Sequence, residues 1–372
     1  MRILIASDKF KGSATGAEVA ASLGEGILSV RADAVIESVP VADGGEGTVD
    51  AALAAGFTAD AAEVTGPVGD PVTARFAVRG SQAIIEMAAA SGLDALPGGV
   101  RAAREATSRG TGDLIRAALD RGCTQVVLGI GGSANTDGGA GMLQALGVSL
   151  KDASGEELPG GGAALASLAT VDVSGLDPRL AGTEFVLASD VDNPLLGERG
   201  AAAVFGPQKG ASAADVAELD AALAHFAALL EQRPGVRPSI AAAGAGAAGG
   251  VGYAALAVLG ARREPGVEVV QRLTGLADRV VGADLVITGE GSLDDQSLGG
   301  KTPLGVAAVA RAAGVPVIAV CGRSTLDAAA VASAGFQRVY ALSEVEPDVE
   351  KSIANAKTLL VDVGRTVARD IL

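Results

Sequence analysis

Short apolar runs alternate with helix-like segments at both ends of this 372-residue chain, and this alternation constrains its fold more than any other feature. Near the N-terminus, the apolar runs 3–6 and 34–39 are followed by segments 16–28 and 47–55, whose apolar residues recur with helical spacing. Short apolar strands separated by helices are typical of a parallel sheet covered on both faces. The alternation of apolar runs and helices returns after about residue 282, with strands expected over 284–288, 316–320 and 338–341 and a final helix over 349–372.

The middle of the chain has a different sequence pattern. From residue 61 to 87, Gly-Pro and Asp-Pro turns separate short alternating runs, which predicts antiparallel hairpins. Another hairpin is expected over 148–158, with its turn at Ser154 and Gly155. This region therefore differs from the parallel sheet that the two ends of the chain predict.

Together, the two sequence patterns predict an α/β protein of two domains. One is a doubly wound parallel sheet built from both termini, residues 1–63 plus 283–372, and an inserted mixed α/β domain over 64–282 interrupts it. Ligands of doubly wound sheets bind beyond the carboxyl ends of the strands. Because an inserted domain tends to create a cleft there, we expect the functional site in an interdomain cleft.

The composition argues against several kinds of partner. The chain carries a net charge of −15, which repels nucleic acids and anionic membranes. Its N-terminal apolar run is too short for a signal peptide, and the uncharged run 241–261 is too rich in glycine for a membrane span. Cys123 and Cys321 lie far apart and fit buried thiols better than a metal site or a disulfide scaffold. We therefore expect a cytoplasmic protein, and the sequence leaves a homo-oligomer open.

Four loops that follow apolar runs combine glycine or small hydroxyl residues with carboxylates. One such loop is most often a turn or a helix cap, but several at the same predicted sheet edges indicate a shared site. Carboxylates beside a glycine-rich loop suit a metal–phosphate ligand, because Mg²⁺ binds one or two carboxylates together with phosphate oxygens. The four loops are "DGGEG" at 43–47, "GGSANTDGG" at 131–139, "SDVDNP" at 189–194 and "TGEGSLDD" at 288–295. The lysines available to bind phosphates are Lys9, Lys11, Lys209 and Lys301.

Two nucleotide-binding patterns are incomplete. "GKT" at 300–302 resembles the end of a P-loop, but Asp295 stands where that motif requires glycine. "GAGAAG" at 244–249 fits a dinucleotide-binding pattern, but no strand is expected before it, which favours a helix N-terminus that approaches another backbone or a phosphate. The only histidine, His225, lies inside an expected helix, where a packed or surface position fits better than catalysis. Any general base must therefore be a carboxylate or a lysine.

A series of longer motifs occurs in order along the chain: "SDKFKGS", "VADGGEGTVDA", "GPVGDPV", "IEMAAASGL", "ATSRGTGDLI", "IGGSANTDGGAGMLQALG", "SDVDNPLLGERGA", "FGPQKGA", "GAGAAGG" and "ADLVITGEGSLDDQSLGGKTPLGVA". Together they resemble the bacterial glycerate kinase family of the two-domain, non-P-loop type, from residue 3 to about residue 356. The resemblance implies ATP- and Mg²⁺-dependent phosphorylation of D-glycerate, with 2-phosphoglycerate as the product. It also implies a flavodoxin-like domain interrupted by a second α/β domain.

Within this activity, we expect carboxylates and lysines at the strand ends to do the chemistry. A carboxylate must accept the proton of the reacting hydroxyl, and Asp190 is preferred to Asp43 for this role. Lys11 is expected to bind the glycerate carboxylate. The other expected substrate contacts are Glu86, Ser91, Thr107 and Ser108. The expected phosphate contacts are Gly110, Thr111, Gly131, Gly132, Ser133 and Lys209, and the expected Mg²⁺ ligands are Asp190, Glu290 and Asp294.

Two other functions remain as alternatives. Asp190 and Asp192 follow an apolar run as in the nucleophile motif of haloacid-dehalogenase-like phosphatases, although Pro194 stands where that motif has threonine. The other alternative is a non-catalytic protein that binds a metabolite in the cleft. ATP consumption that depends strictly on glycerate would exclude both.

Overall fold

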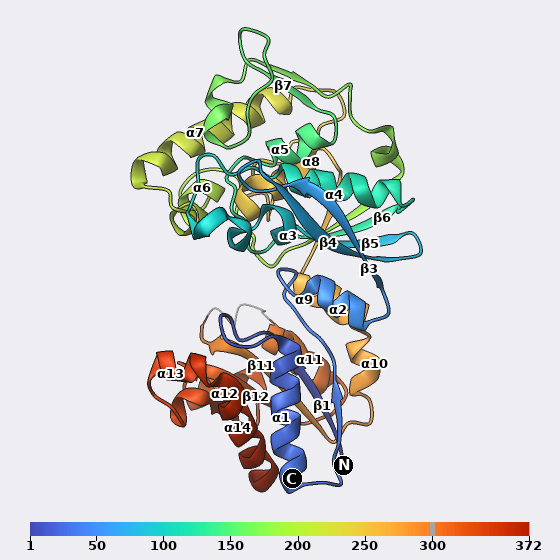
Figure 1. The fold of residues 1–372 in the computed structure, drawn as a ribbon, viewed down its shortest axis with the longest axis vertical. Coiled ribbons are helices and arrows are strands. Elements are labelled where there is room, and N and C mark those ends of the chain that lie inside the picture. Colours follow the sequence, from blue (N-terminus) through green and yellow to red (C-terminus); the bar gives the residue numbers. More distant parts are fainter. Residues whose placement is uncertain (296, 298–301, 372) are drawn as a thin grey trace. The chain divides into compact units, whose positions relative to one another are not determined.

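The computed structural model describes residues 1–295, 297 and 302–371. Packing divides the chain into two units (Figure 1). The first unit comprises Met1–Asp43, Asp50–Ala55 and Val267–Leu372, and the second comprises Gly44–Val49 and Gly56–Gly266. The first unit is therefore built from both ends of the chain, as the sequence predicted.

Five parallel strands form the sheet of the first unit, in the order β13-β12-β11-β1-β2. Numbered along the chain within this unit, the order is 2-1-3-4-5, which is that of flavodoxin-like sheets. The prediction of a doubly wound sheet built from both termini is confirmed. The strands are β1 (Arg2–Ser7), β2 (Val35–Ser38), β11 (Leu285–Leu293), β12 (Val317–Ser324) and β13 (Val339–Ala341).

Alternate residues of the central strand β1 face opposite layers of helices. Ile3 and Ile5 belong to a buried cluster with apolar residues of α1 and α14, whereas Leu4 and Ala6 belong to a cluster with α10 and α11. Helices thus cover both faces of the sheet, as its fully buried strand required. The helices that lie mostly in this unit are α1 (Gly16–Val30), α2 (Thr48–Ala54), α9 (Gly266–Thr274), α10 (Leu276–Val280), α11 (Thr302–Ala312), α12 (Ala328–Ala334), α13 (Val349–Ala354) and α14 (Ala356–Asp370).

Helices α1 and α14 lie side by side on one face of this sheet (Figure 1). Two glycines allow their backbones to come close. A Cβ atom at Gly26 would lie 2.0 Å from the carbonyl oxygen of Val361, and one at Gly364 would lie 2.4 Å from that of Leu23. The small residues in the composition therefore serve a specific close approach of two helices.

A mixed sheet of six strands forms the second unit, in the order β10-β9-β6-β5-β4-β3. The strands β5, β6, β9 and β10 run parallel, and β3 and β4 are antiparallel, which confirms the hairpins predicted between residues 61 and 87. Its strands are β3 (Thr58–Thr65), β4 (Pro71–Arg79), β5 (Gln82–Glu86), β6 (Gln125–Gly129), β9 (Glu184–Ala188) and β10 (Arg262–Glu264). A separate antiparallel pair consists of β7 (Ser149–Lys151) and β8 (Thr170–Asp172).

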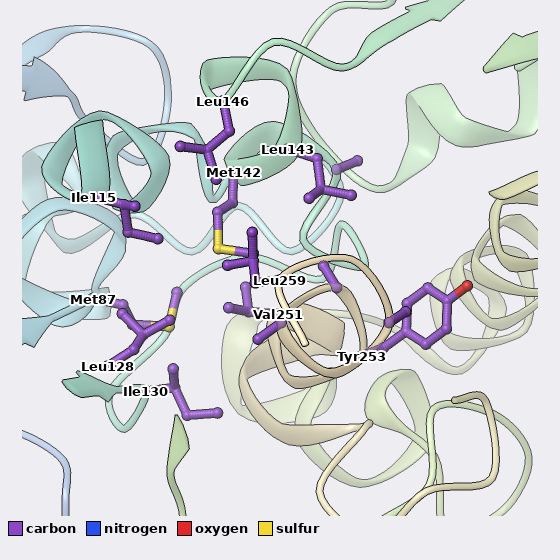
Figure 2. Close-up of a cluster of buried hydrophobic side chains, with 14 of the residues drawn as sticks. Met87, Ile115, Leu128, Ile130, Met142, Leu143, Leu146, Val251, Tyr253 and Leu259 are labelled. Carbon is purple, nitrogen blue, oxygen red and sulfur yellow. The ribbon is translucent and has the colours of Figure 1, made fainter. Parts of the chain in front are cut away.

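The core of the second unit joins this sheet to its helices. Figure 2 shows part of it, where Met87 and Leu128 lie near Ile115 of α4 and Met142 of α5. Val251 of α8 belongs to the same cluster. The helices of this unit are α3 (Ala88–Ser91), α4 (Arg109–Asp120), α5 (Ala140–Ala145), α6 (Ala201–Phe205), α7 (Ala213–Leu230) and α8 (Val251–Ala257).

The glycine-rich stretch before α8 packs against other backbone segments. A Cβ atom at Gly249 would lie 2.0 Å from the carbonyl oxygen of Asn135, and one at Gly246 would lie 2.2 Å from that of Pro194. This agrees with the interpretation as a helix N-terminus that approaches another backbone. His225 in α7 is exposed, and its Nε2 lies 2.6 Å from the carbonyl oxygen of Leu168. Within the described residues, no helix is long and apolar enough to span a membrane.

Two local expectations differ from the structure. The expected helix over 349–372 is interrupted at Asn355, whose backbone leaves the helical region at φ −109° and ψ 16°. The expected hairpin over 148–158 keeps its turn, with Gly155 at a positive φ, and includes one bridge between Lys151 and Glu157. The strand β7, however, pairs along its length with β8.

The transitions between the two units lie earlier in the chain than the sequence predicted. Residues 56–63 were expected in the first domain, but β3 pairs with β4 along its whole length and belongs to the second unit. Residues 267–282 were expected in the insertion, but Leu276 and Val280 pack in the core of the first unit. The short segment Gly44–Val49 also packs with the second unit.

The close approach of α1 and α14 predicts opposite effects of one substitution at two positions. Gly26→Ala should destabilise the protein by about 1–3 kcal/mol, because the new Cβ would overlap the carbonyl group of Val361. Gly24→Ala is the matched control, since its Cβ would make an ordinary contact 3.4 Å from Ile36, and it should add about 0.5–1 kcal/mol through helix propensity. Urea denaturation measures both, and equal effects of the two substitutions would refute this account of the packing.

Candidate active site

The carboxyl ends of three adjacent strands carry acidic residues in the first unit. Asp8 follows β1, Asp43 follows β2, and Glu290 lies near the end of β11. In doubly wound sheets, ligands bind outside the carboxyl ends at the point where the strand order reverses. In the order β2-β1-β11 this point lies between β1 and β11, so Asp8 stands at the position where the topology predicts a ligand.

Asp8 is held by three hydrogen bonds. Its backbone N–H donates to the carbonyl oxygen of Gly289 at 2.9 Å. One carboxylate oxygen, Oδ1, accepts from the backbone N–H of Lys9 at 2.7 Å, and the other, Oδ2, accepts from the hydroxyl of Thr302 at 2.9 Å. Both oxygens therefore have fixed directions.

Burial raises the pKa of the Asp8 carboxyl, and the negative charge of Asp43 raises it too, so that this pKa lies at about 7. The hydrogen bonds from Lys9 and Thr302 act in the opposite direction. Asp8 therefore gains and loses its proton near neutral pH, unlike an ordinary aspartate.

The sequence reading missed Asp8 as a site residue. It lies in "SDKFKGS", where only the lysines were singled out. The available signal was its position directly after the first strand, which a doubly wound fold places at the centre of the sheet edge. Its hydrogen-bond partner Thr302 was also missed, because the two residues are brought together only by the fold.

The other predicted residues of the first unit surround the same sheet edge. Lys11 is exposed, and its backbone nitrogen lies 3.4 Å from the position of a Cβ atom on Gly291. Glu290 is half-buried beside Cys321; burial raises the pKa of that thiol to about 12, and the charge of Glu290 contributes. Asp294 accepts a hydrogen bond from the hydroxyl of Ser292 at 3.2 Å. Lys301 lies outside the described residues.

Carboxylates also stand at the sheet edge of the second unit. Asp190, just after β9, accepts a hydrogen bond from the backbone N–H of Gly266 at 2.8 Å. Glu86, at the end of β5, accepts one from the backbone N–H of Val49 at 2.6 Å. Both side chains are half-buried. These predicted residues are thus anchored to backbone amides at the carboxyl ends of parallel strands.

The glycines of "DGGEG" and of the loop after β6 allow these two segments to touch. A Cβ atom at Gly129 would lie 2.4 Å from the carbonyl oxygen of Gly44, and one at Gly131 would lie 2.6 Å from the Cα of Gly45. A Cβ at Gly132 would lie 2.8 Å from a carboxylate oxygen of Glu46. Gly129 and Gly131 are therefore required by the close approach of the acidic loop, and Gly132 is exposed with a positive φ.

Asp137 is the centre of a buried hydrogen-bond network in the loop after β6. Its carboxylate accepts from the backbone N–H and the hydroxyl of Ser108, both at 2.8 Å, and from the side-chain amide of Asn135 at 2.7 Å. It also accepts from the backbone N–H groups of Gly139 and Gly141. The predicted substrate contact Ser108 thus serves to join the start of α4 to this loop.

Lys209 lies beside this network and is fully buried. Its ammonium group donates to the carbonyl oxygen of Asn135. Burial lowers the pKa of Lys209 to about 7, and the negative charge of Asp137 opposes this shift. In this structure the ammonium contacts protein atoms, so a phosphate contact of Lys209 stays a prediction.

The remaining predicted residues lie around the first turn of α4. The hydroxyl of Thr111 donates to that of Ser91 at 3.1 Å, and both side chains are fully buried. The hydroxyl of Thr107 accepts from the backbone N–H of Arg109 at 3.2 Å. A Cβ at Gly110 would lie 2.0 Å from the carbonyl oxygen of Thr65, so this glycine is required by the packing of α4 on β3. Ser133 is buried and forms a bridge with Gly92.

The described part of the chain does not assemble a metal site from protein side chains alone. Among the described residues, no group of three or more histidine, cysteine, aspartate or glutamate side chains is placed to hold a metal ion. Mg²⁺ commonly takes only one or two carboxylates and completes its shell with water and phosphate oxygens. Asp190, Glu290 and Asp294 therefore remain predicted ligands for an ion that arrives with a nucleotide.

Comparison with known proteins identifies related chains over the full length. The model of the glycerate kinase family matches residues 3–372. Glycerate 2-kinase of Escherichia coli K12 is 45% identical, with 99% of this chain and 97% of that protein covered. Glycerate kinase of Bacillus subtilis 168 is also 45% identical and covers 100% of this chain and 98% of its own. A crystal structure from Salmonella typhimurium LT2, provisionally called glycerate kinase 2, superposes with a TM-score of 0.82 at 43% identity, covering 99% and 97% of the two chains.

The Asp137 network predicts a large loss of stability on a small change. Asp137→Asn replaces one acceptor oxygen by an amide that faces several buried N–H and O–H donors, and it should destabilise the protein by about 2–4 kcal/mol. Asp70→Asn is the control, because Asp70 is exposed. Chemical denaturation of both variants tests the role; an Asp137→Asn variant as stable as the control would contradict it.

Proposed function

The chain belongs to the glycerate kinase family and is a glycerate kinase, and we propose that it transfers the γ-phosphoryl group of ATP to the 2-hydroxyl of D-glycerate. The observation that supports the 2-hydroxyl is the full-length similarity to the E. coli protein named glycerate 2-kinase. ATP is the ordinary phosphoryl donor of kinases. Action in the cytoplasm and assembly into a homo-oligomer stay predictions.

We assign the substrate to the sheet edge of the first unit. Glycerate is a small anion, and a cation must bind its carboxylate. Lys11 is our candidate, because it is exposed and its backbone lies near Gly291 of β11 at this sheet edge. The hydroxyl to be phosphorylated then needs a carboxylate within hydrogen-bond reach. The sequence offered Asp190 and Asp43 for this role, and the geometry adds Asp8.

The loop after β6 supports the binding of phosphate groups. Gly132 is exposed and Gly131 is half-buried, so their backbone amides can approach an anion more closely than those of larger residues could. Each of the predicted ligands Asp190, Glu290 and Asp294 offers the hard carboxylate oxygens that Mg²⁺ prefers. When bound, Mg²⁺ would neutralise part of the negative charge on the phosphates.

A coupled assay tests the reaction and the attacked hydroxyl together. The purified protein, ATP, Mg²⁺ and D-glycerate are mixed with enolase, and no phosphoglycerate mutase is present. Enolase converts only 2-phosphoglycerate to phosphoenolpyruvate, so phosphoenolpyruvate should form at once and in step with ADP. L-glycerate and a sample without glycerate are the controls for substrate dependence.

Three other results have distinct meanings. The phosphate would be on the 3-hydroxyl if ADP is released without phosphoenolpyruvate and phosphoenolpyruvate forms only after mutase is added. Phosphate release from phosphoglycerate without ATP would favour the phosphatase alternative. Glycerate binding without any ADP release, in the presence of active controls, would favour a metabolite-binding protein.

A further inference from the structure

We propose that Asp8 is the general base of this reaction, and that its carboxylate accepts the proton of the glycerate hydroxyl that attacks the γ-phosphorus of ATP. This inference deepens the proposed function and rests on it. It differs from the expectation that Asp190 or Asp43 is the base, and it follows from where the fold places Asp8.

The position of Asp8 is the first argument. It directly follows β1, the strand beside which the order of the sheet reverses, and β1 pairs with β11 as far as Ser7 and Gly289. A Cβ atom at Gly289 would lie 2.0 Å from the carbonyl oxygen of Val320, so the backbone that receives the Asp8 N–H is tightly fixed. Asp43, by contrast, lies several residues beyond the end of the outer strand β2.

The hydrogen bonds of Asp8 are the second argument. The backbone N–H of Lys9 and the hydroxyl of Thr302 each occupy one lone pair of a different carboxylate oxygen. Each ionised oxygen has a second lone pair, so it can still accept a proton from a substrate hydroxyl. Asp8 is half-buried, which leaves part of its surface accessible. The two protein donors thus orient the carboxylate without using up its capacity as an acceptor.

The charges around Asp8 are the third argument. Asp43 from the segment after β2 is the negative neighbour, Lys9 is the positive one, and Thr302 from α11 and the Gly289 carbonyl are the neutral partners. Burial and the charge of Asp43 raise the pKa of Asp8 to about 7, although Lys9 and Thr302 act in the opposite direction. A general base is most effective when its pKa lies near the working pH, because it is then ionised and still basic.

The reaction balances with these groups. The O–H bond of the glycerate hydroxyl breaks, and its proton forms a bond to a carboxylate oxygen of Asp8. The hydroxyl oxygen forms a bond to the γ-phosphorus, and the bond from that phosphorus to the β,γ-bridging oxygen breaks. ADP leaves with the electron pair of that bond, and Asp8 later returns its proton to water.

The first variant to test is Asp8→Asn. It should lower kcat by about 10²- to 10⁴-fold, the usual contribution of a positioned base. The variant should be at least as stable as the wild type at pH 8. Because the pKa of Asp8 is raised in the folded state, its ionised carboxylate destabilises the folded protein above pH 7, and asparagine removes that charge. The Thr302 hydroxyl can rotate to accept a hydrogen bond from the new amide. Asp33→Asn removes an exposed carboxylate of the same unit and is the matched control.

The pH profile of kcat/KM provides the sharper test. In the wild type, activity should fall as the pH drops through about 7, because Asp8 takes up a proton. Thr302→Val removes a hydrogen bond that favours the charged form, so this acid limb should move to higher pH, whereas Thr302→Ser keeps the hydroxyl and should leave the limb in place. Asp43→Asn removes the negative neighbour, so the limb of its residual activity should move to lower pH.

The outcomes separate this inference from the proposed function. Glycerate-dependent ADP release by the wild type at pH 8.5 establishes the kinase whatever the variants do. The substrates titrate in the same way whichever variant is assayed. Their titration therefore cannot move the acid limb to higher pH in Thr302→Val and to lower pH in Asp43→Asn. A stable Asp8→Asn variant with near-normal kcat would overturn the inference. Acid limbs that coincide in the Thr302→Val and Thr302→Ser variants would also overturn it, as would loss of all activity on Asp43→Asn alone.

Discussion

Contacts between backbone segments at glycines hold the strand ends of both units in place, and the functional groups depend on them. In the first unit, Gly289 lies so close to Val320 that no larger residue fits, and its carbonyl group fixes the backbone of Asp8. In the second unit, Gly44 and Gly129 meet in the same way. These glycines thus allow close backbone packing at the strand ends that carry the carboxylates.

Burial of charge is the second physical theme of the structure. Asp8 is partly buried near another carboxylate, which favours its protonated form and keeps its proton exchangeable near neutral pH. Asp137 is fully buried, but its backbone and side-chain donors satisfy the negative charge. The first environment suits a group that exchanges a proton during a reaction, and the second suits one that stabilises a loop. The same residue type thus has two roles, which its hydrogen-bond partners and charged neighbours decide.

The sequence predicted the fold well because its main signals are local. The alternation of apolar runs and helices gave the doubly wound sheet, and the Gly-Pro and Asp-Pro turns gave the hairpins of the second unit. Pairing between distant segments could not be predicted in the same way, as the partnership of β7 with β8 shows. The environment of Asp8 depends on residues 43, 289 and 302, which only the folded chain brings together. Sequence motifs therefore predicted carboxylates at these strand ends, but their preference for Asp190 over Asp43 left out Asp8.

The most direct test of this account is to observe the titration of Asp8 itself. Carbon NMR of protein labelled at the aspartate carboxyl groups, recorded from pH 4 to 9, resolves each titrating side chain. We predict one aspartate resonance with an apparent pKa near 7 in the wild type and its loss in Asp8→Asn. A wild-type protein in which every aspartate titrates below about pH 5, the ordinary range for this residue, would contradict the central claim that the fold tunes Asp8 as a base.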